Sequence, residues 1–257
     1  MTDTNTLLQG GLHTTNSLVS SRFIFDVDGT LTPSRQPMDA EFQKWFVNFQ
    51  EHNYVYLITG SDRDKTLEQV GSIVYNFSDK VYNCSGCDVW EQDKNVRTSN
   101  WTLPKDVEEW LSGFLTESKF VLRTGLHFEH RPGMCNFSII GRNANMEQRK
   151  MYVAWDEKYN ERNTIARMLT DRFEYVDARV GGETGIDIFA KGSDKSQIVK
   201  DFNPCDILHF FGDAMTPNGN DYPLKKVIID NDLGHCYNVK DYKETWKILK
   251  EDFEWMI

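Results

Sequence analysis

Apolar runs of strand length alternate with helical repeats of aromatic residues at both ends of the chain. Runs typical of buried strands cover Phe23–Phe25, Tyr54–Ile58, Val81–Cys84 and Ile207–Phe211. Between the first two, aromatic residues at i, i+3, i+4 and i+7 predict a helix with one apolar face over Asp39–His52. A strand, a helix and a strand in this order form a βαβ unit, so we expect parallel strands covered by helices.

The middle of the chain departs from this alternation. After a predicted hairpin at 88–98 come a helix at 105–115, extended segments at 120–123, 126–131 and 135–140, and helices at 146–158 and 162–171. Strands and helices grouped in blocks are typical of an α+β unit. We therefore predict a cap domain at residues 90–188, inserted into a core domain formed by 22–89 and 189–257.

The α/β pattern resumes after the insertion. The segment Ile186–Phe189 is extended, and Ser193-Asp194-Lys195 opens a helix that runs to about Phe202. A short strand is expected at Val227–Ile229, and apolar residues from Trp246 to Phe253 predict a closing helix. The predicted fold class is therefore α/β, with a Rossmann-like parallel-sheet core and an inserted α+β cap.

Composition sets limits on the function. The 257 residues are 39% hydrophobic and 26% charged, as in an ordinary soluble protein of one large or two smaller domains. No stretch approaches the ~20 apolar residues of a membrane helix. The net charge of −10 argues against nucleic-acid binding. Residues 1–21 are rich in Thr, Asn, Ser and Gly and lack a signal-peptide pattern, so we expect a flexible tail.

The cysteines indicate a reducing compartment, and we expect a cytoplasmic protein. Their number, five, is odd, and the chain shows no export signal. Cys84 and Cys87 form a C-x-x-C motif. Because no second pair accompanies it and no helix opens there, a metal or redox role is disfavoured.

Two aspartates end the first predicted strand. Asp26 and Asp28 are two residues apart and precede a Gly-Thr turn, so both carboxylates would face the same side of the strand. Like charges this close are costly unless a cation or a reacting group uses them. A D-x-D-G-T block after a buried strand indicates the nucleophile of a phosphoryl-transfer site rather than a polar turn.

Other polar residues follow the predicted core strands, where ligands of parallel sheets bind. Ser61 lies at a strand end and at an expected helix N-cap, from which its hydroxyl could bond a phosphoryl oxygen. Lys195 begins a helix and is a candidate partner for Asp26. Asp213 follows an apolar strand and could join Asp26 and Asp28 around Mg²⁺, which prefers oxygen ligands.

These motifs resemble those of the haloacid dehalogenase superfamily of Mg-dependent phosphotransferases. The resemblance implies that Asp26 attacks phosphorus and that Asp28 acts as general acid and base. It further implies that Ser61 and Lys195 stabilise the phosphoryl group. Asp26, Asp213 and the backbone carbonyl of Asp28 would hold Mg²⁺.

Arg131, Arg142 and Arg149 lie at the ends of the predicted cap strands and on the following helix. Their spacing alone fits surface arginines as well as an anion clamp. A closer similarity to the eukaryotic-type phosphomannomutase family, from about Phe23 to His235, favours the clamp. It rests on four blocks, which are Asp26–Gln36, His130–Arg142, Gly181–Phe189 and Phe210–Asp221.

That resemblance implies a mutase that interconverts mannose 1-phosphate and mannose 6-phosphate, with the glucose phosphates as further candidates. It would work through an aspartyl phosphate, with Mg²⁺ and hexose 1,6-bisphosphate as activator. A homodimer through the cap is also implied. The substrate-binding residues would be Arg35, Arg131, Arg142, Arg149, Thr184, Gly185 and Asp187, with Asn220 and Asp221 in supporting positions.

The nearest alternative is a sugar-phosphate phosphatase with the same core and cap. A non-catalytic sugar-phosphate-binding protein is disfavoured because Asp26, Asp28, Lys195 and Asp213 are all present. One departure from the mutase family concerns the substrate, since Gly185 stands where the family has a serine.

Overall fold

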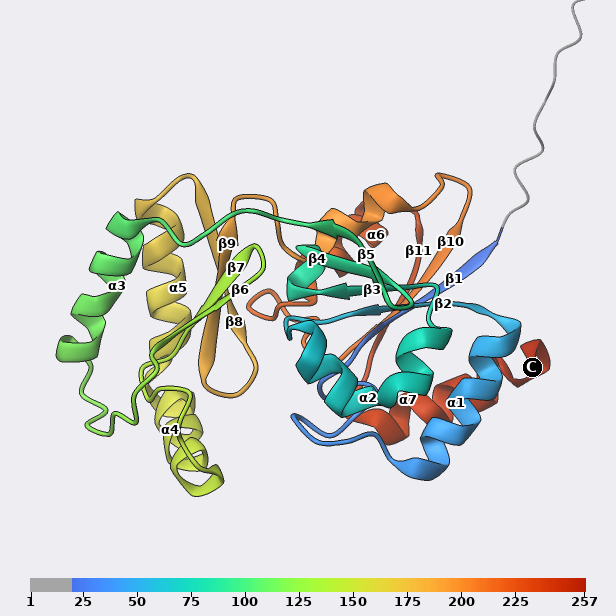
Figure 1. Cartoon of the computed structure of the whole chain (residues 1–257), viewed down its shortest axis with the longest axis horizontal. Helices are drawn as coiled ribbons and strands as arrows, with labels where there is room; N and C mark the ends of the chain where they lie inside the picture. Colours follow the sequence, from blue (N-terminus) through green and yellow to red (C-terminus); the bar gives the residue numbers. More distant parts are fainter. Residues whose placement is uncertain (1–19) are drawn as a thin grey trace, which may run out of the picture.

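The computed structural model describes residues 20–257 (Figure 1). Residues 1–19 of the expected flexible tail lie outside this range. The tail was predicted two residues too long, because Ser20 O accepts a hydrogen bond from Ile207 N and Ser21 is the first residue of β1 (Ser21–Asp26). Within the described range, no helix has the length and apolar character needed to span a membrane.

The core is a seven-stranded sheet in the order β11-β10-β1-β2-β3-β4-β5. The strands from β11 to β3 are parallel to their neighbours, and β4 and β5 form an antiparallel hairpin on the β3 edge. The further strands are β2 (Tyr54–Ile58), β3 (Lys80–Asn83), β4 (Asp88–Glu91), β5 (Lys94–Thr98), β10 (Ile207–Gly212) and β11 (Gly234–Asn238). The predicted parallel α/β core is thus confirmed.

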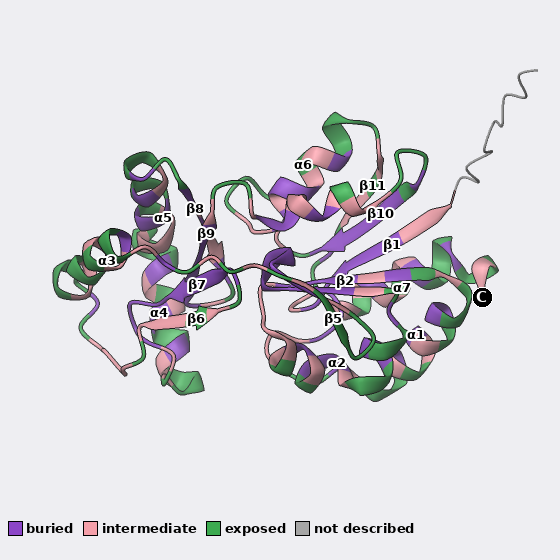
Figure 2. Cartoon of the chain, turned by 45° about the horizontal axis from the view of Figure 1, so that its top comes forward, coloured by how far each residue is buried: buried purple, intermediate pink, exposed green. Residues whose placement is uncertain are grey.

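Helices cover both faces of this sheet, so its central strands are buried on both sides (Figure 2). Phe23 and Phe25 pack with α1, α2 and α7, whereas Ile24 between them packs with α6 and η2 on the other face. These elements span α1 (Ala40–His52), α2 (Arg63–Phe77), α6 (Tyr222–Asp230), α7 (Tyr242–Asp252) and the 3-10 helices η1 (Cys84–Gly86), η2 (Lys195–Asp201) and η3 (Glu254–Met256).

The cap is a four-stranded antiparallel sheet in the order β6-β7-β9-β8, with its helices on one face (Figure 1). Apolar residues on the helix side form a second core, and the other face is turned toward the core domain. The elements are α3 (Lys105–Glu117), β6 (Phe128–Arg131), β7 (Met134–Phe137), α4 (Met146–Tyr159), α5 (Glu161–Arg172), β8 (Val176–Gly181) and β9 (Gly185–Ala190).

The strand pairing in the two sheets indicates ends of the inserted cap that differ from the predicted 90 and 188. The predicted start at residue 90 falls inside the β4–β5 hairpin, and both strands of that hairpin belong to the core sheet. The extended segment Ile186–Phe189, assigned to the returning core pattern, lies instead in β9 between β7 and β8. We therefore propose that the cap comprises residues from about 99 to 190.

Two further expectations were wrong. Val227–Ile229 lies in α6, where Leu224 and Ile228 are buried one turn apart. A three-residue apolar run cannot distinguish a strand from a buried helical turn. The segment Phe120–Arg123 forms no strand. Strands β8 and β11 were not predicted, because β8 is mixed in polarity and β11 is largely unburied.

Candidate active site

A cleft of about 460 Å³ lies between the carboxyl ends of the core strands and the cap. Asp26 and Asp28 line it from the core, and Arg131, Arg142 and Arg149 line it from the cap. Other predicted site residues in the lining are Arg35, Ser61, Asp187, Asp213 and Asn220. Outside the lining, and buried, are the predicted residues Lys195, Thr184, Gly185 and Asp221.

Asp26 is the last residue of β1 and is almost fully buried. The Nζ of Lys195 lies 2.5 Å from Oδ1 of Asp26 and 2.7 Å from Oδ1 of Asp221. Burial raises the pKa of Asp26 well above its usual range, and Lys195 only partly offsets this. Burial disfavours the charged lysine, but Asp221 and Asp26 together outweigh it and raise the pKa of Lys195. A charged lysine therefore bridges two carboxylates at the base of the cleft.

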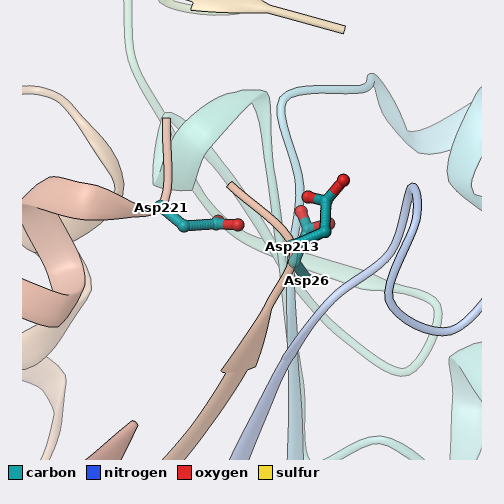
Figure 3. Close-up of side chains that lie close together, drawn as sticks. All are labelled: Asp26, Asp213 and Asp221. Carbon is teal, nitrogen blue, oxygen red and sulfur yellow. The ribbon is translucent and has the colours of Figure 1, made fainter. Parts of the chain in front are cut away.

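Asp26, Asp213 and Asp221 bring their carboxylates together (Figure 3), with oxygens within 4.8 Å of one another. Desolvation and the charge of Asp221 raise the pKa of Asp213 to about 7. Three carboxylates repel one another unless a cation joins them, and a set of hard oxygen donors suits Mg²⁺. The three residues therefore fit a divalent cation. Asp221, which was predicted only in a supporting position, belongs to this cluster.

The turn after the strand leaves room for this cluster only because residue 29 is glycine. A Cβ on Gly29 would lie 2.4 Å from Oδ2 of Asp213, and the φ angle of Gly29 is +80°. Both the collision of an added Cβ with Asp213 and the positive φ angle therefore favour glycine over any other residue at position 29. The predicted Gly-Thr turn therefore lets the side chains of Asp26 and Asp213 lie close together.

The carboxylate of Asp28 is held by two donors. The backbone N–H of Arg35 at 2.6 Å and the side-chain amide of Gln69 at 2.9 Å both donate to Oδ1. Gln69 is a buried residue of α2 that also donates to Oγ1 of Thr32 at 3.2 Å. Among residues 20–257, Oδ2 of Asp28 makes no hydrogen bond, so this oxygen is the one available for proton transfer.

Ser61 follows β2 and lines the cleft, but the prediction that it caps the next helix was wrong. Asp62 is the N-cap of α2, because its carboxylate accepts a hydrogen bond from Lys65 N at 2.9 Å. Ser61 is held through its backbone N–H, which donates to Oγ1 of Thr59 at 3.0 Å. The Ser61 hydroxyl has no partner in the described part of the chain and is available to a ligand.

Glu129 of β6 organises two of the cap arginines. It pairs with Arg131 at 3.1 Å and also with Arg142. The Nη1 of Arg131 additionally donates to the carbonyl of Gly60 in the core at 2.6 Å. This hydrogen bond ties the cap to the loop that holds Ser61.

Arg149 on α4 is buried, with 3% of its surface exposed. Its Nε and Nη2 donate to Oε2 of Glu183 at 3.2 and 3.0 Å. Its Nη1 is buried and has no hydrogen-bond partner among the described residues. Because an unpaired buried donor is costly, this group suits an anion entering the cleft.

Arg35 adds positive charge from the core loop. Burial lowers its pKa, and the charge of Arg149 adds to the effect. Burial also lowers the pKa of Arg142, where Glu129 opposes the charges of Arg35 and Arg131. The predicted arginines therefore line the same cleft, three from the cap and Arg35 from the core, and together they favour an anion there.

A family model for eukaryotic phosphomannomutases matches residues 42–255, most of this chain. The chain belongs to the eukaryotic phosphomannomutase family. A phosphomannomutase of Saccharomyces cerevisiae is 30% identical over 240 residues, which cover 90% of this chain and 93% of the relative. One of Spinacia oleracea is 30% identical over 241 residues, covering 90% and 94%.

Solved structures support the fold. The IMP-nucleotidase of Plasmodium falciparum superposes with a TM-score of 0.57 at 14% identity, covering 90% of this chain and 68% of that one. A haloacid dehalogenase-like hydrolase from Bacteroides thetaiotaomicron gives 0.56 at 12% identity, covering 91% and 100%. The predicted haloacid dehalogenase-type fold is confirmed.

This chain has Gly185 where the phosphomannomutase family has a serine, and a neighbouring side chain, Asn136, accompanies this difference. A Cβ on Gly185 would lie 2.4 Å from Nδ2 of Asn136, and this amide donates to Oδ1 of Asp187 at 2.6 Å. Burial raises the pKa of Asp187, and Arg131 opposes the shift. The amide of Asn136 therefore occupies the space that a serine at 185 would use.

Thr184, the other residue predicted near this position, has a buried hydroxyl without a hydrogen-bond partner among the described residues. Its carbonyl accepts a hydrogen bond from Oγ of Ser138 at 2.9 Å. Contact of Thr184 or Gly185 with a substrate stays a prediction.

Sequence reasoning missed Gln69, Glu129, Asn136 and Glu183. Glu129 had a local signal, because it lies two residues before Arg131 on the same face of β6. The contacts of the other residues join segments far apart in the chain and had no such signal. Cys84 and Cys87 are free and buried and pack with Met134 and Phe189 of the cap, consistent with a packing role.

Proposed function

We propose that this chain is an isomerase that interconverts mannose 1-phosphate and mannose 6-phosphate. The observation that supports this most directly is the pairing of Asp26 and Asp28 with a group of cap arginines across one cleft. A mutase has to hold a sugar that carries two phosphates, one at the reacting aspartate and one away from it. The membership of the chain in the phosphomannomutase family points to the same reaction.

The cycle starts with a phosphoryl group on Asp26, received from a hexose 1,6-bisphosphate activator. The C6 hydroxyl of mannose 1-phosphate attacks this phosphorus, and the bond between phosphorus and the Asp26 oxygen breaks. Asp28 accepts the proton of the hydroxyl on Oδ2. The product is mannose 1,6-bisphosphate.

In the second half, the bisphosphate turns so that its C1 phosphate faces Asp26. The carboxylate of Asp26 attacks that phosphorus, the bond to the C1 oxygen breaks, and Asp28 returns its proton to this oxygen. Mannose 6-phosphate leaves, and Asp26 is phosphorylated again. Asp28 thus acts in both half-reactions.

Residues around Asp26 offset the negative charge of the transferring group. We propose that Asp26, Asp213 and Asp221, with the backbone carbonyl of Asp28, hold Mg²⁺, which supplies positive charge there when bound. The ammonium group of Lys195 lies against the Asp26 carboxylate. The Ser61 hydroxyl would donate to a phosphoryl oxygen, and Asn220 lines the cleft near them.

The cap holds the phosphate that does not react. We propose that Arg131, Arg142 and Arg149 bind it, with the unpartnered Nη1 of Arg149 as one donor. Asp187 would accept a hydrogen bond from a sugar hydroxyl. Arg35, which borders the same cleft, would contact the substrate from the core side.

A sugar-phosphate phosphatase would use the same groups but would let water reach the phosphorylated Asp26. The hydrogen bond from Arg131 to the carbonyl of Gly60 joins cap and core at the cleft that Asp26 also lines, and a cap held against the core would restrict water there. The relatives of this chain are named phosphomannomutases, so they do not favour the phosphatase alternative.

The test is incubation with mannose 1-phosphate, Mg²⁺ and a catalytic amount of hexose 1,6-bisphosphate. We expect mannose 6-phosphate to form with little release of inorganic phosphate. Release of inorganic phosphate without mannose 6-phosphate would refute the mutase. Glucose 1-phosphate in a parallel assay measures the preference between the two sugars. Asp26→Asn should abolish turnover.

We also propose that the protein works in the cytoplasm and pairs through its cap, as its family resemblance suggests. Several apolar side chains of the cap are exposed, among them Val121, Leu126 and Met151. Light scattering of the purified chain measures its mass, and a single-chain mass at all concentrations would refute the dimer.

A further inference from the structure

A second cavity, of about 380 Å³, lies beside the active-site cleft. Residues of α5 and β8 line it from the cap, and Pro217 and Asn218 line it from the core. Val180 and Asn218 border both the cavity and the cleft, so the two spaces share a wall. No step of the proposed reaction uses this cavity.

Two arginines in the lining have no partner. Within residues 20–257, the side chains of Arg167 and Arg179 make no hydrogen bond and no ion pair. Arg167 is exposed and Arg179 is half-buried. The Nε of Arg179 is buried and lacks a hydrogen-bond partner in the described chain. A buried unpaired N–H is costly, so this donor suits an acceptor supplied by a ligand.

The sheet fixes the direction of Arg179. It lies opposite Asp187 in the antiparallel β8–β9 pair, and residues opposite each other in such a pair point to the same face. Asp187 lines the active-site cleft, so Arg179 projects from the same face, one strand further along. Asp171 also lines the cavity but pairs with neither arginine among the described residues, which leaves both guanidinium groups available.

We propose that this cavity binds a phosphate-bearing small molecule. Guanidinium groups bind phosphate oxygens through paired N–H donors. The cavity lies at β8, the edge strand of the cap sheet, so Arg179 borders it from the cleft face and Arg167 borders it from α5 on the other face. On the core side the ligand would meet Asn218, which belongs to the loop between Asp213 and Asp221. A ligand that touches both the cap and this loop would bridge the two domains beside the active-site cleft.

The test is the melting temperature of the full chain in inorganic phosphate, compared with chloride at equal ionic strength and without Mg²⁺. Arg149→Ala removes an arginine of the active-site cleft. We expect phosphate still to raise the melting temperature of this variant by about 3 °C at ten times the dissociation constant. Arg149→Ala/Arg179→Ala should lose this rise. Arg149→Ala/Arg172→Ala is the matched control, because Arg172 on α5 does not line the cavity, and it should keep the rise.

Two results would overturn the proposal: no phosphate-dependent rise in Arg149→Ala, or the same rise after Arg179→Ala is added. Glycerol 3-phosphate in place of phosphate identifies the source. A larger rise with the ester supports an organic phosphate, and an equal or smaller one supports free phosphate. The measurement requires no turnover, so failure of the proposed mutase reaction would leave its outcome unchanged.

Discussion

The side-chain amide of Gln69 donates a hydrogen bond to Oδ1 of Asp28 at 2.9 Å, although the residues are 41 positions apart. The bond joins helix α2 to the turn after β1 and fixes the carboxylate proposed to transfer the proton. The same amide donates to Thr32, so the position of Asp28 depends on a helix outside its own motif.

Replacing Gln69 with leucine should therefore lower kcat about tenfold while KM for mannose 1-phosphate changes little, because Asp28 loses a hydrogen bond to its charged form. Steady-state kinetics measures both constants. Gln50→Leu is the control, since Gln50 is also buried and donates to Val74 O and Ser78 but does not touch Asp28. Equal kcat values for the two variants would contradict the positioning role.

Activity should require glycine at position 29 for two reasons, which are its positive φ angle and the lack of space for a Cβ beside Asp213. In Gly29→Ala the new Cβ would collide with the Asp213 carboxylate, and we expect activity to fall about a hundredfold. Gly192→Ala has a similar φ of +77° with open space around the new Cβ. Both should lose about 1–2 kcal/mol of stability, but Gly192→Ala should keep its activity. Chemical denaturation and kinetics separate the effects, and equal activity in both variants would contradict the collision.

Removing one of the clustered carboxylates should raise the melting temperature without metal and reduce the further rise that Mg²⁺ produces. Asp213→Asn relieves charge repulsion with Asp26 and Asp221, so in EDTA its melting temperature should exceed that of the parent by about 2 °C. The rise that Mg²⁺ produces in the parent should shrink in the variant, because a ligand is lost. Melting curves in EDTA and in Mg²⁺ test both. An unchanged Mg²⁺ effect would exclude Asp213 as a ligand.

The buried His209 should make the core sensitive to acid. It is 8% exposed and stacks on Phe23, and burial lowers its pKa from 6.5 to about 4. As pH falls below 6.5, the unfolded chain takes up the proton first, so the stability from the neutral imidazole is lost between pH 6.5 and about 4. The loss would be at most about 3 kcal/mol.

In His209→Phe the loss of stability between pH 6.5 and about 4 that comes from His209 should disappear. Urea denaturation at several pH values gives the free energy of unfolding of each protein, and the difference between them should change with pH only in that window. A constant difference from pH 7 to pH 4 would show that His209 does not titrate there.

Restoring the family serine should weaken rather than improve the site. The Cβ of Gly185→Ser would displace the Asn136 amide and break its hydrogen bond to Asp187. We expect KM for mannose 1-phosphate to rise about tenfold, because Asp187 is the group proposed to hold a sugar hydroxyl. A KM equal to or below that of the parent would indicate that Asn136 moves freely.

Local patterns predicted most of the core. The run Phe23–Phe25 and the aromatic repeat from Phe42 to Phe49 are strong signals because their side chains are buried on the faces that their periods imply. Val227–Ile229 was assigned wrongly because its apolar run was too short to show a period. The β4–β5 hairpin was predicted correctly but placed partly in the cap, since strand pairing over distance decides which sheet it joins.

The sequence by itself placed the two aspartates proposed to be catalytic, because Asp26, Asp28 and the glycine after them are local in the chain and follow a recognisable strand. It also placed Asp213 and Lys195 at the correct ends of their elements. Only the tertiary structure decided that Asp221 meets Asp26 through Lys195, that Gln69 holds Asp28, and that Arg131 reaches Gly60. The reason is physical: a carboxylate needs charges and donors within a few ångströms, and folding brings these from segments whose separation leaves no pattern in the sequence.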